Sequence, residues 1–416
     1  MTRVAIVGGT RTPFVKAAGA FARYSFMDLG VHVIKSAVSE MKLDANKLDE
    51  LIFSTVLLDP RTPNAARELV LRSGISSRLN AHFISNNCIS GLVAANMISE
   101  GIKSGRINSG LAGGSESMSQ PTLTLKKSAE MFFLRLAYAR SLGQKLSALS
   151  AFRPSMIMPQ PPSPKEPSTQ LTMGQHQEMT SQEFNIPREA QDEIAYKSHA
   201  NAAKAQASGV LAEEITPLGK VDKDNIVRAD TSVEKLAKLR PVFDRSEKGT
   251  LTAGNSSPLT DGASVVCLMS EAEAKAQGRE PLAFIERVEF SAIDPNHGLL
   301  MAPGLALPAL LNKSGLTVSD IDYFEVHEAF ASQVLSNMAV WENGWAKYPE
   351  IKPIGKIPMD KLNVNGSSIA IGHPFAATGG RLLLTLANQM KRTNAKKGVI
   401  SVCAAGAMGC AVLLTR

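Results

Sequence analysis

The chain has 416 residues and carries 45 Lys and Arg side chains against 38 Asp and Glu, which gives a formal net charge of +7. This length predicts two or three packed domains, and the sequence contains no apolar run long enough to span a bilayer. The basic balance leaves nucleic acid, an acidic membrane surface or a polyanionic small molecule as partners. Without a zinc finger, an aromatic RNA-binding motif or a dense Lys/Arg block, nucleic acid ranks last.

The opening residues and the cysteines indicate the compartment. Residues 1–3 lead directly into the apolar run 4–7, which predicts a first strand rather than a signal or transit peptide. The four cysteines form neither a CxxC pair nor a metal-binding spacing with histidine. We therefore expect free thiols in a reducing compartment, the cytoplasm, and no metal site.

Strands and helices alternate through the first 120 residues. Strands are expected at 3–8, 51–56 and 110–114, and helices at 27–41, 66–71 and 92–98. The glycines of 110–114 predict close backbone approaches that only glycine allows. The alternation predicts an α/β fold with a mostly parallel sheet.

The character of the sequence changes between residues 121 and 249. Basic and large apolar side chains are mixed over 126–153, which predicts a basic amphipathic helical region. A proline-rich break follows at 159–164, and a longer helix is expected from Pro187 to about 208. We interpret the whole span as an insertion domain, and a solvated face remains the alternative for most of its charge.

Two stretches of the chain resemble each other. Residues 43–53 and 316–326 both show a polar helix start, a Leu/Ile-Asp pair and then a strand. A weaker echo links the glycine-rich strands 109–115 and 399–409. These echoes predict two halves of one ancestral unit, with the insertion inside the first half, and coincidence is the alternative.

A cysteine directly precedes an apolar helical segment in the run Ser85-Asn86-Asn87-Cys88-Ile89-Ser90-Gly91. A cysteine at a helix start lies among unpaired backbone N–H groups at the positive end of the helix dipole. Those groups favour the thiolate, which is the nucleophilic form. A small buried cysteine is the alternative for this stretch taken alone.

Three stretches in the second half carry reactive side chains beside small residues. They are the run 326–330 with His327, the glycine-rich run 363–380 with His373, and the run 401–409 with Cys403. Each taken alone is compatible with a structural role. Together with Cys88 they indicate a nucleophile with acid and base partners.

These four stretches resemble the four signature blocks of the thiolase family, and the likeness extends over the whole chain, including 11–14 and 239–244. The chain most resembles the thiolase (beta) subunit of the fatty-acid oxidation trifunctional complex. His327 stands where most stand-alone thiolases have Asn, and Cys403 is followed by Ala-Ala-Gly rather than Ile-Gly-Gly. The basic amphipathic segment is also typical of that branch.

The resemblance implies a thiolase fold, an α/β fold of two similar βαβ-type halves with layered sheets and helices. The expected N-terminal half comprises 1–120 and 250–271, the inserted loop domain 121–249, and the C-terminal half 272–416. The implied activity is that of an acetyl-CoA C-acyltransferase. It cleaves 3-ketoacyl-CoA with CoA through an acyl-cysteine intermediate, in fatty-acid β-oxidation. CoA enters as a substrate, and no permanently bound cofactor is expected.

The resemblance also implies residue roles. Cys88 is the expected nucleophile, His373 the base and Cys403 the second acid/base. His327 is expected to hold a water that helps His373 at one oxyanion, and the backbone N–H groups of Cys88 and Ala405 to serve the other. The remaining assignments are Ser257 at the pantetheine arm, Phe243, Met173 and Phe330 along the CoA tunnel, and Asn365 orienting the active-site loop; core packing or a turn role is the alternative for all but Ser257.

The implied partners are a second copy of the chain, as a homodimer or homotetramer, and a hydratase/dehydrogenase alpha subunit. Residues 126–153 are expected to dock on such a partner or on an anionic membrane, and packing on the chain's own active-site entrance is the alternative.

Rival functions remain. A biosynthetic acetoacetyl-CoA thiolase uses the same residues in the opposite direction. A decarboxylating ketoacyl synthase usually lacks a second catalytic cysteine, so Cys403 argues against it. A non-catalytic acyl-CoA-binding subunit needs none of the reactive side chains, and nothing in the sequence supplies the substrate groove of a cysteine protease.

Overall fold

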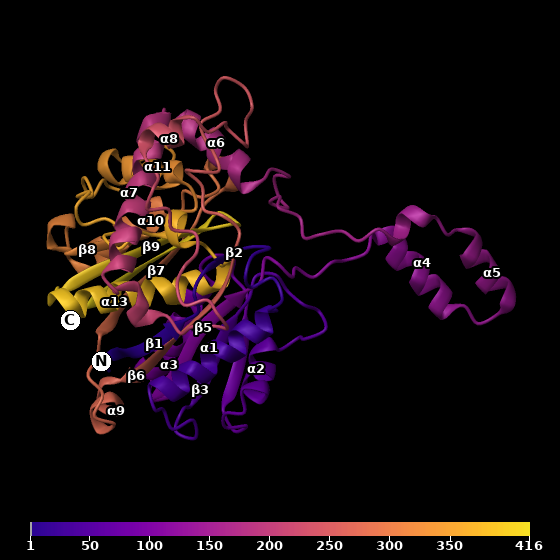
Figure 1. The fold of residues 1–416 in the computed structure, drawn as a ribbon, viewed down its shortest axis with the longest axis horizontal. Coiled ribbons are helices and arrows are strands. Elements are labelled where there is room, and N and C mark those ends of the chain that lie inside the picture. Colours follow the sequence, from indigo (N-terminus) through magenta and orange to yellow (C-terminus); the bar gives the residue numbers. More distant parts are fainter. Residues whose placement is uncertain (1) are drawn as a thin grey trace.

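A single mixed sheet of ten strands forms the centre of the protein, and the computed structural model describes residues 2–416 (Figure 1). The strand order is β4-β3-β5-β6-β1-β7-β10-β9-β8, with the short β2 paired to β6. The strands are β1 (Val4–Arg11), β2 (Val15–Lys16), β3 (Glu50–Ser54), β4 (Asn80–Ile84), β5 (Ser109–Glu116), β6 (Thr260–Ser270), β7 (Ala283–Ala292), β8 (Tyr323–Val326), β9 (Lys397–Ala404) and β10 (Met408–Thr415).

The sheet repeats one arrangement twice. In the first half β3 pairs parallel with β5, β5 antiparallel with β6, and β6 antiparallel with β1. In the second half β8 pairs parallel with β9, β9 antiparallel with β10, and β10 antiparallel with β7. The two halves join through an antiparallel pairing of β1 with β7. The echoed sequence stretches end in equivalent strands, β3 with β8 and β5 with β9, as two similar halves require.

The expectation of a mostly parallel sheet is wrong. Only the pairs β3–β4, β3–β5 and β8–β9 are parallel among the described residues, and the other six pairs are antiparallel. The central strands β6 and β10 are buried along nearly their whole length, so they read as continuous apolar runs. Such runs are typical of parallel strands, and the direction of a strand is not encoded in its burial.

Helices cover both faces of the sheet. They are α1 (Phe26–Glu40), α2 (Ala65–Ser73), α3 (Ser90–Lys103), α4 (Lys127–Tyr138), α5 (Leu142–Ser150), α6 (Met173–Glu183), α7 (Arg188–Ala207), α8 (Val233–Ala237), α9 (Glu271–Ala276), α10 (Pro303–Ser314), α11 (Ala331–Asn343), α12 (Ser368–Ile371) and α13 (Thr378–Thr393). One apolar core encloses α3 and α13 between the two halves of the sheet. Separate cores bury α1 and α2 on the first half, and α10 and α11 on the second.

Most of the predicted elements are present with shifted ends. The glycine prediction for 110–114 is confirmed, since a Cβ on Gly113 would lie 2.2 Å from the Ser264 carbonyl oxygen and one on Gly114 would lie 2.4 Å from that of Ala376. The long insertion helix is α7, and Pro187 is its extended N-cap rather than its first helical residue. Cys88 lies just before the helix, because α3 begins at Ser90 with Ile89 as its N-cap.

The predicted insertion contains two physically different parts. Helices α6, α7 and α8 pack on the body of the protein, whereas α4 and α5 project far from it at the end of two long connecting loops (Figure 1). We call the projecting part, residues 121–165, the arm. An antiparallel bridge between Thr124 and Gln160 joins its two connections. The arm therefore lies away from the packed body of its own chain (Figure 1).

The arm exposes its apolar side chains. Twelve of the 21 exposed large hydrophobic residues of the described chain lie between residues 123 and 158. Its own core is small, with Phe132 against Phe133 and Phe152 at ring-centroid distances of 5.1 and 5.3 Å. None of the helices in residues 2–416 combines the length and apolar character needed to cross a bilayer.

Candidate active site

Two helix starts cross at a pair of glycines and bring Cys88 to His373. A Cβ on Gly91 at the start of α3 would lie 2.9 Å from the Ala376 carbonyl oxygen. A Cβ on Gly379 at the start of α13 would lie 2.6 Å from the Leu92 nitrogen. The backbones can approach this closely only because both residues are glycine. The residues preceding the two helices meet as a result, with His373 Nε2 3.2 Å from Cys88 Sγ.

The hydrogen bonds around His373 select its tautomer. Its Nδ1 lies 2.6 Å from Thr378 Oγ1, and that hydroxyl donates to the Pro374 carbonyl oxygen at 3.3 Å. The Thr378 oxygen then accepts from Nδ1–H, which leaves a lone pair on Nε2 facing the Cys88 thiol. Burial and the Arg381 guanidinium lower the pKa of His373 to about 3, so the ring is a neutral base at neutral pH.

The Cys88 thiol is protonated at rest. Its burial among low-polarity surroundings raises its pKa to about 12, and nearby Glu116 adds to that effect. Backbone N–H groups of Ala405 and of Cys88 itself act in the opposite direction but do not outweigh burial. The helix start is expected to lower the pKa of Cys88, but the shift is in the opposite direction, since Cys88 precedes the N-cap and burial dominates. Ionisation requires transfer of the proton to His373.

Cys403 is fully buried beside Cys88 at the end of β9. Burial and the neighbouring Cys88 raise the pKa of the Cys403 thiol well above its ordinary value. It packs in one apolar cluster with Phe330 and Leu300. A thiol that stays protonated in such surroundings is suited to donate a proton rather than to act as a nucleophile.

His327 follows β8 and stacks against His373, with ring centroids 4.1 Å apart. Its Nδ1 lies 2.7 Å from Ser368 Oγ, which also accepts a hydrogen bond from Arg381 at 3.0 Å. The Ser368 proton is thereby available to Nδ1, and His327 Nε2 carries the hydrogen. Nε2 is buried and has no protein partner in residues 2–416. Burial, His373 and Arg381 all lower the pKa of His327.

The two histidines thus present opposite chemistry to one small space. His373 offers a lone pair to Cys88, and His327 offers an N–H without a partner in the described chain. One ring can accept a proton while the other stabilises negative charge or holds a water.

A tight turn completes the site opposite Cys88. The β9–β10 turn, residues 405–407, has Gly406 and Ala407 at left-handed φ values of 75° and 55°. The Ala405 carbonyl oxygen accepts a hydrogen bond from Asn87 Nδ2 at 3.0 Å, and the Ala405 N–H faces the Cys88 sulfur. Both backbone N–H groups that are expected to bind an oxyanion lower the pKa of the Cys88 thiol.

Asn363, two residues before the expected Asn365, makes the contacts that orient a loop of the site. Asn363 has a φ of 47°, accepts from the Val326 N–H at 2.7 Å and donates to Glu328 at 2.6 Å. It holds the segment that carries His327. The Asn365 amide instead donates to Gln389 of α13 at 3.1 Å. The run Asn-Val-Asn-Gly at 363–366 indicates a turn, because asparagine tolerates the left-handed region. The first asparagine of the run is the one that adopts it.

The residues expected to meet CoA lie together. Phe330, Phe243 and Met173 belong to the same apolar cluster as Cys403, and the two phenyl rings pack edge to face at 5.6 Å. Ser257 is half-buried, and its N–H donates to the Ala329 carbonyl oxygen at 2.9 Å. These positions give one wall of the site apolar character, which suits the thioester arm of an acyl-CoA.

Buried charges beneath the site were missed from the sequence. Arg11 forms a paired contact with Asp224 at 2.7 and 2.9 Å and a third with Glu214 at 2.7 Å. Arg381 lies 3.9 Å from Glu325, whose pKa burial raises to about 8. Arg381 also bonds Ser368, so this network reaches the histidines. In the sequence, the buried network is indicated only by the single basic residues Arg11 and Arg381 within otherwise uncharged runs.

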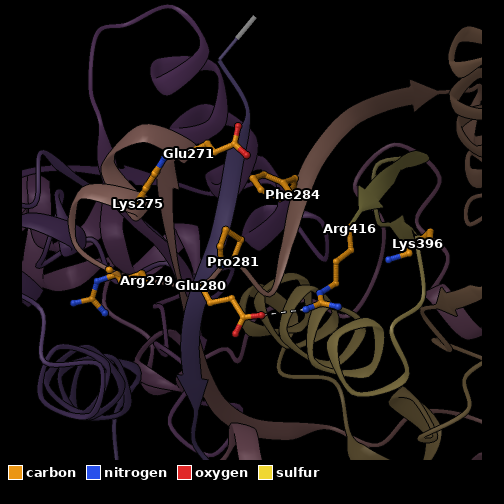
Figure 2. Close-up of a pocket in the computed structure, with 9 residues that line it drawn as sticks. Glu271, Lys275, Arg279, Glu280, Pro281, Phe284, Lys396 and Arg416 are labelled. Carbon is orange, nitrogen blue, oxygen red and sulfur yellow. Dashed lines mark hydrogen bonds and ion pairs between the residues drawn. The ribbon is translucent and has the colours of Figure 1, made fainter.

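Among residues 2–416 no cluster of three His, Cys, Asp or Glu side chains could hold a metal ion. A surface hollow is present at the far end of the sheet, lined by Glu280, Phe284, Lys396 and Arg416 (Figure 2). Arg416 follows β10 directly, whereas the β9–β10 turn precedes it, so the hollow and the reactive cysteines lie at opposite ends of one strand.

Comparison with known proteins identifies the family. The thiolase N-terminal domain model matches residues 4–272, and the thiolase C-terminal domain model matches residues 279–416. The chain belongs to the thiolase family. It is 40% identical to 3-ketoacyl-CoA thiolases of Shewanella woodyi and Pseudoalteromonas translucida, over 99% of this chain and 96% of each relative.

A solved thiolase-fold structure supports the same assignment. The acetyl-CoA acetyltransferase of Bacillus anthracis superposes with a TM-score of 0.82 and is 29% identical, covering 100% of this chain and 99% of that one. The predicted family and thiolase fold are thereby confirmed, and membership makes the chain an acyltransferase enzyme.

Proposed function

We propose that this protein catalyses the thiolysis of 3-ketoacyl-CoA by CoA, giving acetyl-CoA and a shortened acyl-CoA, as a step of fatty-acid β-oxidation. The observation that carries the proposal is the contact of 3.2 Å between His373 Nε2 and Cys88 Sγ, beside the buried thiol of Cys403. A nucleophile, a neutral base and a second proton donor in one site are what this two-step transfer needs.

In the first step the Cys88 proton passes to His373 Nε2, and the sulfur attacks the keto carbon of the substrate. The resulting oxyanion faces the N–H groups of Cys88 and Ala405, while His327 and a water that it holds are suited to the charge that develops on the departing acetyl-CoA carbanion. The bond between the second and third carbons then breaks. The departing acetyl-CoA carbanion takes the proton of Cys403, which becomes a thiolate, and Cys88 retains the acyl group.

In the second step the Cys403 thiolate takes the thiol proton of incoming CoA. The CoA sulfur attacks the Cys88 thioester, and the new oxyanion faces the N–H groups of Cys88 and Ala405. Collapse releases the shortened acyl-CoA, and the Cys88 sulfur regains its proton from His373. Protons and electron pairs balance over the cycle, and no bound cofactor is required.

Ser257, Phe243, Met173 and Phe330 are the proposed contacts of the pantetheine arm and acyl chain. The cluster that Phe243, Met173 and Phe330 share with Cys403 supports the assignment of these three, and the hydrogen bond from the Ser257 N–H to the Ala329 carbonyl oxygen places Ser257 beside that cluster. We also propose a homodimer or homotetramer. The four free cysteines favour a reducing compartment such as the cytoplasm.

The arm is the proposed docking surface of the enzyme, either for a hydratase/dehydrogenase subunit or for an anionic membrane. Between residues 126 and 153 it carries six basic side chains and one acidic side chain among exposed apolar ones. Apolar anchors supply affinity and the charges supply orientation in such a surface.

A second candidate is biosynthetic condensation of two acetyl-CoA molecules, which the likeness to the solved acetyl-CoA acetyltransferase favours. One experiment tests both functions. Purified protein is assayed for thiolysis of 3-ketoacyl-CoAs from four carbons upward, and for condensation of acetyl-CoA, with and without the partner subunit. Faster thiolysis of long substrates supports the β-oxidation role. Activity confined to acetoacetyl-CoA supports the biosynthetic one, and inactivity on all substrates contradicts the proposal.

A further inference from the structure

A carboxylate from the base of the arm enters the candidate active site. Glu166 lies directly after the arm and is only 9% exposed. Its backbone is fixed by two hydrogen bonds of 2.8 Å, from Glu166 N–H to the Leu171 carbonyl oxygen and from Gln170 N–H to the Glu166 carbonyl oxygen. A bridge between Lys165 and Thr172 closes this short hairpin. The side chain therefore projects from a fixed support.

Its partner is the β9–β10 turn. Glu166 Oε2 accepts a hydrogen bond from the Gly406 N–H at 3.0 Å, across 240 residues of sequence. The other end of the same peptide group is the Ala405 carbonyl oxygen, which accepts from Asn87 Nδ2 at 3.0 Å. The peptide between Ala405 and Gly406 is thus held on one side by the neighbour of the nucleophile and on the other by the insertion.

The contact between Glu166 and the Gly406 N–H matters because the neighbouring residue, Ala405, carries an expected oxyanion donor. The Ala405 N–H belongs to the preceding peptide, which the Ala405 Cα joins to the 405–406 peptide. Fixing the 405–406 peptide therefore limits the movement of the Ala405 N–H, which acts on the Cys88 thiol. The turn itself is strained, because Ala407 has a left-handed φ of 55°. A left-handed conformation is unfavourable for a residue other than glycine, because its Cβ crowds the backbone. A turn of this kind needs outside contacts to hold one geometry.

We propose that Glu166 is a positioning residue for the reaction, which fixes the β9–β10 turn so that the Ala405 N–H points at the oxyanion formed on the Cys88 adduct. This inference rests on the proposed acyl-cysteine chemistry. The carboxylate acts through the turn and does not touch the reacting atoms. A donor fixed before the reaction stabilises developing charge without reorganisation, which is the physical basis of its effect on rate.

The test compares Glu166→Ala with Glu166→Gln and uses Lys165→Ala as the matched control. Glutamine keeps a carbonyl oxygen that can accept from the Gly406 N–H, whereas alanine removes the acceptor. Lys165 is the exposed neighbour on the same hairpin. Its backbone N–H donates to Ser163 Oγ and not to the β9–β10 turn. Single-turnover acylation of Cys88, steady-state kcat and KM for CoA, and the rate of Cys88 alkylation by iodoacetamide are measured for each variant.

We expect Glu166→Ala to slow acylation and kcat by about tenfold, which is part of the effect of about 10²–10³-fold typical for loss of a whole oxyanion donor. KM for CoA should change by less than about twofold, and Glu166→Gln should recover most of the rate. Lys165→Ala should match the unmodified enzyme. Unchanged acylation in Glu166→Ala overturns the proposal. The proposal is also overturned if Glu166→Gln loses as much acylation rate as Glu166→Ala and both variants melt at a lower temperature. That result indicates a purely structural role.

The alkylation rate separates this inference from the proposed function. The Ala405 N–H lowers the pKa of the Cys88 thiol in the protein without substrate, so loss of the Glu166 contact should change Cys88 alkylation even in a protein that thiolyses no 3-ketoacyl-CoA. Inactive protein with altered alkylation contradicts the function and supports the positioning role. Active protein with unaltered alkylation and acylation contradicts the positioning role alone.

Discussion

The active site and the arm are stabilised in opposite ways. Around Cys88, side chains from separate segments bond to one another: His373 to Cys88, Ser368 to His327, Asn363 to Glu328. On the arm, most large apolar side chains are exposed, and the helices contact mainly each other (Figure 1). The active site is specified by contacts inside the protein. The arm keeps apolar surface exposed after this chain has folded, which is typical of an interaction surface.

The strongest test of this contrast removes the nucleophile. Cys88→Ala should lower thiolysis by about 10⁴-fold or more, because no other accessible thiol can carry the acyl group. Incubation of the unmodified protein with 3-ketoacyl-CoA in the absence of free CoA should leave an acyl adduct on the Cys88 peptide in a mass spectrum. An adduct confined to Cys403, or full activity in Cys88→Ala, contradicts the assignment.

The second cysteine should separate acylation from turnover. Cys403→Ala should bind substrate and slowly acylate Cys88, while turnover falls by about 10²–10⁴-fold, the usual contribution of a general acid–base group. Cys410→Ala is the matched control, because Cys410 is also a buried thiol but lies in the central apolar core. Near-normal turnover in Cys403→Ala would reduce Cys403 to a packing residue and favour the ketoacyl synthase alternative.

The raised pKa of Cys88 predicts a pH dependence. A thiol with a pKa of about 12 is protonated at neutral pH, and its thiolate fraction grows as the pH rises towards that value. Alkylation of Cys88 by iodoacetamide should therefore increase about tenfold per pH unit between about pH 6 and 9, since the thiolate is the reactive form. A rate that stays constant over this range would instead indicate a standing thiolate–imidazolium pair and restore the helix-start interpretation.

The sequence allowed the family, the fold and the four reactive stretches to be predicted, because each stretch is short and contiguous. It did not reveal what depends on contacts distant in sequence. Strand direction was misjudged because burial on both faces looks the same in parallel and antiparallel strands. The sequence predicts a loop-orienting role for Asn365 but not the support that Asn363 gives to the segment of His327, since only the backbone shows which asparagine adopts the left-handed turn. Thr378, Ser368 and Glu166 are ordinary residues until the fold aligns them with a histidine or a turn.

The smallest expected effect on catalysis, and the most informative about the arm, comes from reversing its charge. Lys126→Glu with Lys127→Glu and Arg135→Glu changes residues far out on the arm, beyond its base at Glu166. Thiolysis of short soluble substrates should remain within about twofold of normal. Co-purification with the hydratase/dehydrogenase subunit, or binding to vesicles rich in anionic lipid at low salt, should be lost, because each basic residue near such a surface contributes about 1 kcal/mol.

A matched control makes the same change of charge elsewhere. Lys220, Lys223 and Lys275 are exposed and lie outside the arm, and their replacement by glutamate should leave association intact. Retained binding to the subunit but not to vesicles would identify the partner as protein, and the reverse would identify it as membrane. Loss of binding in the control as well would mean that net charge alone drives association. If instead thiolysis collapses in the arm variant while neither association changes, the arm serves the active site and the docking role is wrong.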